Sequence, residues 1–274
     1  MGKLIQICGS AFTGSTMLDL MLGNAPDAFS SGEINSWYRP WHSDNFKIMC
    51  GCEQRPCPVW IDLQDVPEDQ YHISVMRQLS VNYVIDSSKF LHWIIDSIRW
   101  ASANNISMVH LLIWKNPIEH AYSHWKRGRS LKKWRKRFIK YHRRFFEINI
   151  PFCAVNYNEL VKYPQSKLSD ICSIIDMPYF PGKERFWEKE HHYLFGNPGV
   201  RKQVENRNSF IQSKVNYPKD FIRIIDPLEK NIAEDDSIQK IISVLKRKDV
   251  SSQNQKDNAV QNFQLKKPYP FWYY

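Results

Sequence analysis

The segment that most limits the possible folds lies at the start of the chain. Leu4–Cys8 is apolar enough for a buried strand, and residues 9–14 then form the glycine-bounded loop GSAFTG. Residues 15–23 follow with a cluster of large apolar side chains, which predicts a helix packed on that strand. A strand, a tight loop and a helix in this order are typical of α/β folds.

Three further segments have the composition of buried strands: Asn82–Ile85, Ser107–Ile113 and Cys153–Val155. Helix-length stretches separate them, including a helical pattern that runs from Tyr157 through Ile175, whereas residues 30–60 are irregular. The sequence therefore predicts an α/β fold with a mostly parallel central sheet flanked by helices. Loops that begin near residues 9, 86, 115 and 157 all follow strands, so we expect them to meet at one edge of the sheet.

The glycine loop has the outline of an anion site, because backbone N–H groups and a helix N-terminus would point at one ligand. ATP and GTP sites place a lysine after the second glycine to reach the β- and γ-phosphates, but Ser15 occupies that position here. This substitution argues against a triphosphate and against kinase chemistry, and it leaves room for a single 5′-phosphate. The alternative is a glycine turn that only packs the helix on the sheet.

The charge balance also points to an anionic partner. The 274 residues carry a formal net charge of +10, and the 43% apolar content excludes a disordered chain. With no signal-peptide pattern and no apolar stretch of roughly 18 residues, we expect a cytoplasmic protein. We interpret residues 1–250 as one domain and residues 251–274 as a partly loose tail whose aromatic end, PYPFWYY, docks elsewhere.

Six motifs in order resemble the sulfotransferases that use 3′-phosphoadenosine 5′-phosphosulfate (PAPS), over roughly residues 4–205. They are GSAFTGSTMLDLMLG, Ser31-Gly32-Glu33, Asp86-Ser87-Ser88-Lys89, Trp114-Lys115-Asn116-Pro117 with Ser123, Asn156-Tyr157-Asn158-Glu159-Leu160, and His192 with Gly196-Asn197 and Arg201. The resemblance implies a P-loop-NTPase-like sulfotransferase architecture. It also implies PAPS as the sulfuryl donor, 3′-phosphoadenosine 5′-phosphate (PAP) as the product and no metal.

The resemblance assigns roles to individual residues. Glu33 matches the base that accepts a proton from the acceptor hydroxyl, and Lys89 matches a lysine that contacts the sulfuryl group. Lys115 and Ser123 match the 3′-phosphate site. The other residues implied in nucleotide binding are Gly9, Ala11, Phe12, Thr13, Gly14, Ser15, Thr16, Met17, Tyr157, Asn197 and Arg201.

Each of these roles has a structural alternative. Glu33 could be a solvated glutamate near a helix end, Lys89 could pair with Asp86 on the surface, and Ser123 could be a helix-surface serine.

Two positions depart from the family pattern. Lys115 stands where the family usually has arginine, which keeps the charge and loses bidentate geometry. Phe12 stands where the family usually has arginine or lysine, which removes a charge from the reaction centre. Another cation must replace it, and we expect Lys89 to do so.

Residues 125–144 read WKRGRSLKKWRKRFIKYHRR and contain eleven Lys or Arg residues. A solvated helical face is one interpretation, and attraction of an anionic acceptor or an acidic membrane is another. The interleaved aromatic residues also permit nucleic-acid binding, which the ordered motifs disfavour. We expect the acceptor to be a carbohydrate or glycolipid hydroxyl, with an aryl or polyketide hydroxyl next; residues that could stack on it, or belong to the core, are Trp37, Trp41, Trp60 and Trp93.

Three cysteines, Cys50, Cys52 and Cys57, lie close together in the irregular segment. We interpret them as free or loop-stapling thiols, with a zinc site that uses His42 as the alternative, because C-G-C differs from the usual CxxC spacing. Two other functions remain open at this point. One is a small-molecule P-loop kinase, and the other is a nucleic-acid or membrane-surface binding protein with a degenerate loop.

Overall fold

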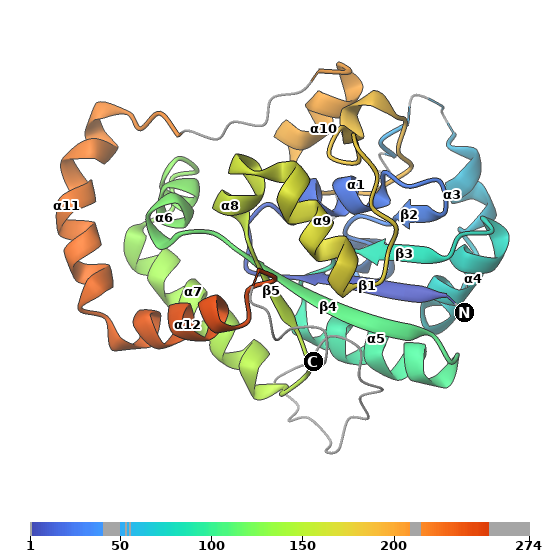
Figure 1. Ribbon diagram of the computed structural model, residues 1–274, viewed down its shortest axis with the longest axis horizontal. Helices are drawn as coiled ribbons and strands as arrows, with labels where there is room; N and C mark the ends of the chain where they lie inside the picture. Colours follow the sequence, from blue (N-terminus) through green and yellow to red (C-terminus); the bar gives the residue numbers. More distant parts are fainter. Residues whose placement is uncertain (1, 41–49, 53, 55, 209–214, 252–274) are drawn as a thin grey trace.

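Five parallel strands form one sheet in the order β2-β3-β1-β4-β5 (Figure 1). This computed structural model describes residues 2–40, 50–52, 54, 56–208 and 215–251, so Trp41, His42 and the aromatic end of the tail lie outside the described residues. The sheet confirms the predicted parallel α/β fold. Its strands are β1 (Lys3–Cys8), β2 (Ala28–Ser30), β3 (Tyr83–Asp86), β4 (Ser107–Trp114) and β5 (Cys153–Asn156).

The four predicted strands are present, and β2 is an addition. This strand has only three residues and pairs with β3 at the sheet edge, so it is too short to give a recognisable pattern. The single helical pattern predicted through Ile175 is two helices, α8 (Tyr157–Lys162) and α9 (Pro164–Ile174). Proline lacks an N–H group and is favoured at the first helical position, so Pro164 begins a new helix.

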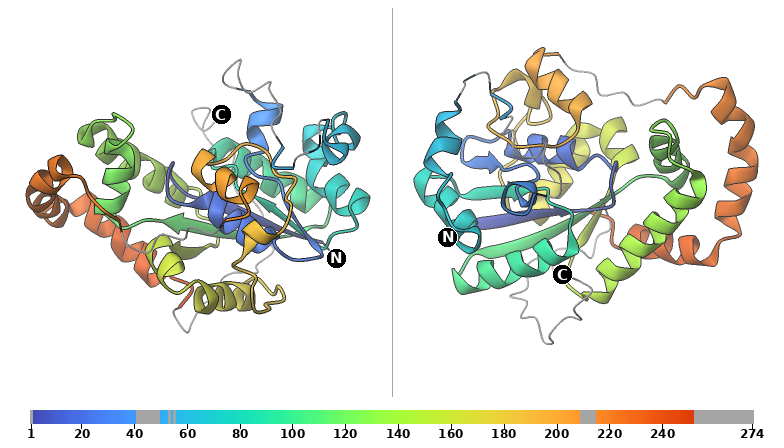
Figure 2. Two further views of the ribbon diagram at one scale, coloured as in Figure 1. Left: turned by 90° about the horizontal axis from the view of Figure 1, so that it is seen from above. Right: turned by 180° about the vertical axis from the view of Figure 1, so that it is seen from behind.

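Helices cover both faces of the sheet because side chains alternate along the buried strands. Ile5 and Ile7 of β1 pack with α1 (Ser15–Gly23), α8 and α9. Cys8 belongs to the cluster on the opposite face, with α5 (Leu91–Ala103) and α7 (Leu131–Glu147). Figures 1 and 2 show these two helical layers on either side of the strands. This arrangement leaves the carboxyl ends of the strands for a ligand.

The remaining helices lie around this three-layer body. At the β5 side, α11 packs on α6 and α12 packs on α7, whereas α3 and α4 lie near β2 and β3 (Figures 1 and 2). No helix in the described part of the chain is long and apolar enough to cross a membrane. The bounds are α2 (Asn35–Tyr38), α3 (Pro58–Asp62), α4 (Tyr71–Gln78), α6 (Pro117–Trp125), α10 (Pro198–Glu205), α11 (Lys219–Ala233) and α12 (Asp236–Arg247), with 3₁₀ turns at Glu68–Gln70 and Phe186–Glu188.

The outer edge of β5 is paired by the chain that follows α12. The Ala154 N–H donates to the Lys248 carbonyl at 2.7 Å, and the Val250 N–H donates to the Ala154 carbonyl at 3.0 Å. A parallel bridge between Ala154 and Asp249 extends the sheet by one residue on this side. The segment after α12 therefore pairs with Ala154 on the outer edge of β5.

Candidate functional site

The glycine loop lies at the carboxyl end of β1 and brings the ends of β4 and β5 together. Gly14 adopts a φ of 99°, and a Cβ atom there would collide with the Tyr157 ring. The Lys115 ammonium lies 3.9 Å from the centroid of the same ring. Loops that follow three different strands therefore meet at Tyr157, as the predicted topology requires.

Buried side chains from α6 and α7 hold the loop backbone in place. The Gly9 N–H donates to the Tyr141 hydroxyl at 2.8 Å, and His120 Nε2 lies 2.8 Å from the Ala11 carbonyl. Trp134 Nε1 donates to His120 Nδ1 at 3.1 Å, so His120 Nε2 carries the proton given to Ala11. Burial lowers the pKa of His120 to about 3, so the ring stays neutral. No sequence pattern predicts these contacts, because Tyr141 and His120 lie over a hundred residues from the loop.

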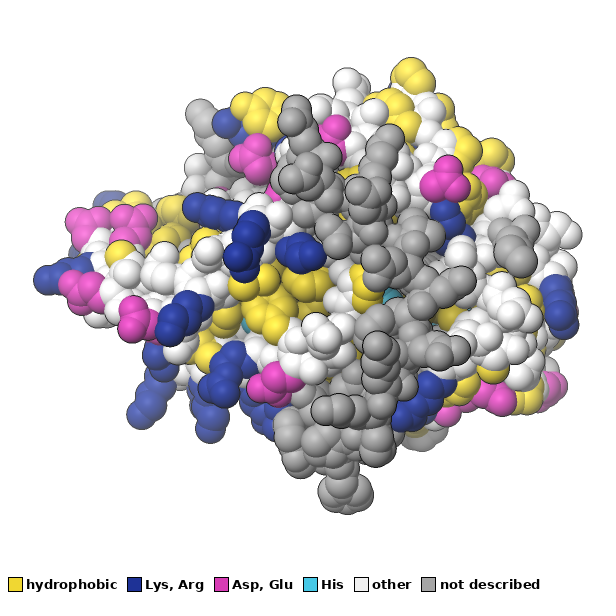
Figure 3. Space-filling view, turned by 60° about the horizontal axis from the view of Figure 1, so that its bottom comes forward, with side chains coloured by type: hydrophobic (Ala, Val, Ile, Leu, Met, Phe, Trp, Pro, Cys, Tyr) yellow, Lys and Arg dark blue, Asp and Glu magenta, His cyan; other side chains and the backbone are white. Residues whose placement is uncertain are grey.

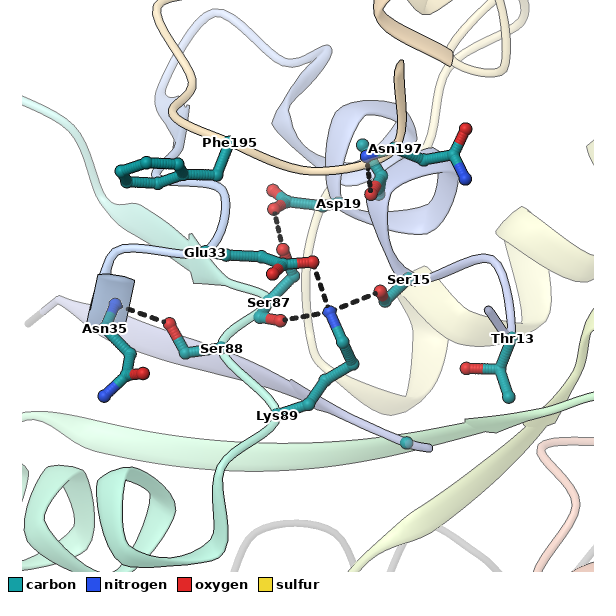
Figure 4. Close-up of polar contacts among 12 residues, drawn as sticks. Thr13, Ser15, Asp19, Glu33, Asn35, Ser87, Ser88, Lys89, Phe195 and Asn197 are labelled. Carbon is teal, nitrogen blue, oxygen red and sulfur yellow. Dashed lines mark hydrogen bonds and ion pairs between the residues drawn. The ribbon is translucent and has the colours of Figure 1, made fainter. Parts of the chain in front are cut away.

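Glu33 and Lys89, the two predicted catalytic residues, form an ion pair beside the loop. Lys89 Nζ lies 2.5 Å from Glu33 Oε1, and it also donates to Ser15 Oγ at 3.1 Å and to the Ser87 carbonyl at 3.2 Å (Figure 4). The side chains are 28% and 15% exposed, respectively, so both can reach a ligand. Lys89 therefore pairs with Glu33 rather than with Asp86. Its ammonium lies beside Ser15, the residue that replaces the usual loop lysine.

Two buried carboxylates fix the loop that presents Lys89. Asp19 of α1 accepts hydrogen bonds from Ser30 Oγ at 2.5 Å and Ser87 Oγ at 2.6 Å, and burial raises the pKa of Asp19 to about 7. Asp86 accepts from His72 Nε2 at 3.0 Å and from the Trp93 indole at 2.7 Å. The Asp86 carboxylate is therefore part of the interior.

The segment 192–197 forms the opposite wall of the site. The Glu33 N–H donates to the Leu194 carbonyl at 3.0 Å, and the Asn197 N–H donates to Thr16 Oγ1 at 3.0 Å. Gly32 has a φ of 71°, and a Cβ there would collide with the Leu194 backbone, so only glycine permits this close approach. The backbone of this segment therefore sets the position of Glu33.

Lys115 lies in the loop between β4 and α6, and Ser123 lies within α6. Burial is the main cause that lowers the pKa of Lys115 to about 8, and the charges of Lys126 and Arg127 contribute. Among the described residues, no carboxylate lies within ion-pair distance of Lys115. Ser123 is buried and donates to the Glu119 carbonyl of its own helix at 2.9 Å. An anion next to Lys115 would stabilise its charged form.

Neither a protein-family model nor a curated protein matches this sequence. Solved structures match it in shape. A sulfotransferase domain from the curacin biosynthetic pathway aligns with 84% of this chain and 98% of that domain, at 15% identity and a TM-score of 0.55. The sulfotransferase domain of the Synechococcus PCC 7002 olefin synthase aligns with 85% of this chain and 95% of that domain, also at 15% identity and 0.55. The chain has the fold of sulfotransferase domains.

Within this sulfotransferase fold, the uncharged Phe12 lies beneath two arginines. The guanidinium carbon of Arg127 lies 4.1 Å from the centroid of the Phe12 ring, and that of Arg129 lies 4.7 Å away. The His124 ring contacts Phe12 edge-on at 5.0 Å. From the sequence we expect Lys89 to replace the missing cation at Phe12. The structure places Arg127 and Arg129 over this ring instead, and their position in the basic stretch does not indicate this contact.

Arg201 and Asn197 lie on the same wall and make backbone contacts. Arg201 donates to the Phe195 carbonyl at 3.2 Å and to the Cys50 carbonyl at 3.3 Å. Asn197 Oδ1 accepts from the Gly199 N–H at 2.9 Å and caps α10. Both side chains organise the chain around the site, and their contact with a nucleotide stays a prediction.

Most of the basic stretch lies in the amphipathic helix α7, and the residues just before this helix form the turn between α6 and α7. The buried side chains of α7 are Trp134, Phe138, His142 and Phe145, whereas Lys132, Lys133, Arg135, Lys136, Arg137, Lys140 and Arg143 are exposed. In Figure 3, Lys and Arg side chains gather on the left half of the face shown, the side on which Figure 1 places α7. The exposed lysines and arginines of α7 offer positive charge. Trp134 and Phe138, two of the aromatic residues between them, are buried in the core.

The tryptophans expected near the acceptor differ in environment. Trp60 and Trp93 are buried in a core cluster with Tyr71, and Trp37 is partly buried against the same cluster. Trp60 and Trp93 therefore belong to the interior.

The three clustered cysteines lie beside His192, a residue far from them in the sequence. One ligand atom from each of Cys50, Cys52, Cys57 and His192 lies within 4.8 Å of every other. All six cysteines of the chain are described, and none forms a disulfide. The zinc site considered from the sequence would use His42, which lies outside the described residues. We call these four residues the sulfur cluster.

Proposed function

We propose that the protein is a sulfotransferase that moves the sulfuryl group of PAPS to an acceptor hydroxyl. The observation that carries this proposal is the Glu33–Lys89 ion pair, which contacts the glycine loop at Ser15 in place of the usual loop lysine. A carboxylate beside a cation at a 5′-phosphate site suits the transfer of a charged group to an alcohol. The sulfotransferase fold provides the matching framework.

The loop suits the phosphosulfate end of the nucleotide. Gly14 begins α1 in a left-handed conformation, and within the described residues no side chain caps this helix, so its first N–H groups suit an anion. Residues 9–17 would hold the 5′-phosphosulfate, and Lys115 beside Tyr157 would hold the 3′-phosphate with Ser123. Bound PAPS supplies a sulfuryl group whose bond to the 5′-phosphate breaks as the acceptor oxygen bonds to sulfur.

Glu33 acts as the base in this proposal. Its carboxylate accepts the hydroxyl proton of the acceptor as the new S–O bond forms, and Lys89 contributes positive charge where negative charge develops. Because Lys89 also contacts Ser15, the ammonium stays at the loop when Glu33 changes partner. Arg127 and Arg129, held over Phe12, replace the cation that the loop lacks. These charges come from side chains and backbone N–H groups, so the proposed transfer needs no metal.

For the acceptor we propose a carbohydrate or glycolipid hydroxyl. The exposed lysines and arginines of α7 support an anionic acceptor or contact with an acidic membrane surface. Burial of Trp134 and Phe138 removes two of the rings that would stack on nucleic-acid bases, which favours these partners over nucleic acid.

A thermal-shift comparison tests the proposal against its alternatives. PAP at about 100 times its Kd should raise the melting temperature by about 5–10 °C, because binding at that concentration stabilises by about 2.7 kcal/mol. ATP with magnesium and an oligonucleotide should give much smaller shifts. A dominant shift with ATP and magnesium would replace the proposal with a kinase, and one with the oligonucleotide would replace it with a nucleic-acid binding protein. Transfer of labelled sulfate from PAPS to glycan and glycolipid acceptors then checks the reaction itself.

A further inference from the structure

We propose that Cys50, Cys52, Cys57 and His192 bind one structural zinc ion. His192 Nδ1 lies 3.4 Å from Cys57 Sγ and 3.9 Å from Cys50 Sγ. Ligand atoms on a tetrahedral zinc ion, with Zn–S near 2.3 Å and Zn–N near 2.0–2.1 Å, are about 3.5–3.8 Å apart. The cluster therefore has the ligand types, the number and nearly the spacing of a closed Cys₃His site.

The surroundings of the sulfur cluster match those of a metal centre. The Cys52 N–H points at Cys50 Sγ at 3.4 Å, a contact that stabilises a thiolate. Glu190 Oε1 lies 3.5 Å from His192 Nε2, so the carboxylate can orient the imidazole with Nδ1 toward the sulfurs. Trp60 Nε1 donates to the His192 carbonyl at 2.8 Å and fixes the backbone of this ligand.

The three cysteines are buried, whereas the His192 side chain is 26% exposed. Cys50, Cys52 and Cys57 are 3%, 2% and 7% exposed and belong to an apolar core cluster with Trp60 and Leu194. Three sulfur atoms and an imidazole in such a setting leave no coordination position open for a substrate. Thiolate ligands exclude magnesium and calcium, and a four-ligand Cys₃His set at tetrahedral spacing is typical of structural zinc.

The proposed ion would join two segments that are far apart in the sequence. Leu194 bridges both to Cys50 and to Gly32, the residue before the proposed base. The Gly51 N–H donates to the Tyr193 carbonyl at 3.0 Å, which adds a backbone contact between the same segments. Zinc bound here would fix segment 192–197, whose Leu194 and Asn197 contact Glu33 and Thr16.

Metal analysis of untagged protein tests the site without any activity measurement. Protein produced in zinc-containing medium should carry one zinc ion per chain by mass spectrometry, and so should the control Cys172→Ser, which changes a buried cysteine outside the cluster. Cys57→Ser and His192→Ala should lose most of the zinc. A folded parent protein without zinc, or equal zinc content in parent and both cluster variants, would overturn the proposal.

Cobalt substitution keeps the test informative if a cluster variant folds poorly. The zinc-stripped parent protein, kept reduced, should bind cobalt with the intense visible bands of tetrahedral coordination and with sulfur-to-cobalt charge transfer. Alkylation should modify Cys50, Cys52 and Cys57 only after a chelator has removed the metal. Weak octahedral cobalt bands, or identical alkylation with and without metal, would refute a Cys₃His site. None of these results depends on the proposed sulfuryl transfer.

Discussion

Two polar centres lie beside segment 192–197, and their side chains differ in how far they are exposed to solvent. Toward the glycine loop lies the Glu33–Lys89 ion pair, with side chains 28% and 15% exposed. In the sulfur cluster the three cysteines are at most 7% exposed, and the His192 side chain is 26% exposed. The buried sulfur atoms fit the structural role proposed for the cluster, and the partly exposed ion pair fits the proposed exchange of a proton with a ligand.

Glu33→Gln should give the largest effect on turnover and tests the Glu33–Lys89 ion pair directly. Loss of the base should lower the turnover number by about 10²–10⁴-fold, while the Kd for PAP changes little. Steady-state kinetics with labelled PAPS and calorimetry with PAP measure the two quantities. Glu188→Gln, at an exposed glutamate paired with Arg185, is the matched control and should keep parental turnover. Near-parental turnover in Glu33→Gln would remove this residue from the base role.

Lys89→Met should lower turnover by about 10²–10³-fold, because it removes a cation from the place where negative charge develops. The melting temperature should change by only a few degrees, since the ion pair is partly exposed. Lys219→Met, at an exposed helix position, is the control. Full turnover in Lys89→Met would show that the ammonium is dispensable.

Arg127→Gln combined with Arg129→Gln should lower turnover by about 10–10²-fold if these side chains supply the charge missing at Phe12. The control Lys132→Gln together with Lys133→Gln removes two charges from the exposed face of α7. If the control pair lowers turnover as much, the effect belongs to the overall field of the helix rather than to the arginines over the ring.

PAP affinity should depend on pH through Lys115. The pKa of this residue is lowered to about 8, so the protonated form that binds the 3′-phosphate is lost as pH rises through that value. The Kd for PAP should rise by up to about fifteenfold between pH 8 and 9.5. Lys115→Arg should give a flat profile over this range because arginine stays charged. A parental Kd that is constant to pH 9.5 would contradict the assignment, as would tight PAP binding by Lys115→Ala combined with Ser123→Ala.

Removal of the metal from the sulfur cluster should have a different effect from the substitutions above. Thermal stability should fall clearly, and turnover should fall only a little. We expect a chelator to lower the melting temperature by about 5 °C or more and to reduce turnover by less than about tenfold at low temperature. Parallel calorimetry and kinetics after dialysis measure both. A collapse of turnover without any loss of stability would mean that the sulfur cluster takes part in the reaction, and the contrast between the two centres would fail.

The two centres also differ in how far the sequence could predict them. Both Glu33 and Lys89 belong to motifs that resemble those of sulfotransferases. The Lys89 motif also follows the predicted strand β3, so topology places its loop at the carboxyl edge of the sheet. The Glu33 motif follows β2, which has no pattern of its own, so only the resemblance pointed to it. The sulfur cluster joins Cys57 to a histidine 135 residues later, and no periodic pattern links these positions. Phe12 shows the same limit, because its arginine partners come from the turn between α6 and α7.

The strands were predictable where their own residues carry a clear apolar pattern. Continuous apolar runs bounded by glycine or polar residues marked β1, β3, β4 and β5. The three-residue β2 carries too little pattern, because its place depends on pairing with β3 rather than on its own composition. Pro164, at a position that divides one helical pattern into two helices, shows that a single residue can decide a boundary that periodicity alone misses.

The pairing of Ala154 with the chain after α12 has a consequence for the behaviour of shortened proteins. An uncovered edge strand offers its N–H and C=O groups to strands of other molecules, and so promotes aggregation. Here residues 248–250 occupy the N–H and C=O groups of Ala154 on β5. A protein that ends before Lys248 would keep the proposed reaction residues but expose the edge of β5. We expect such a protein to aggregate through this edge, with its proposed active site intact.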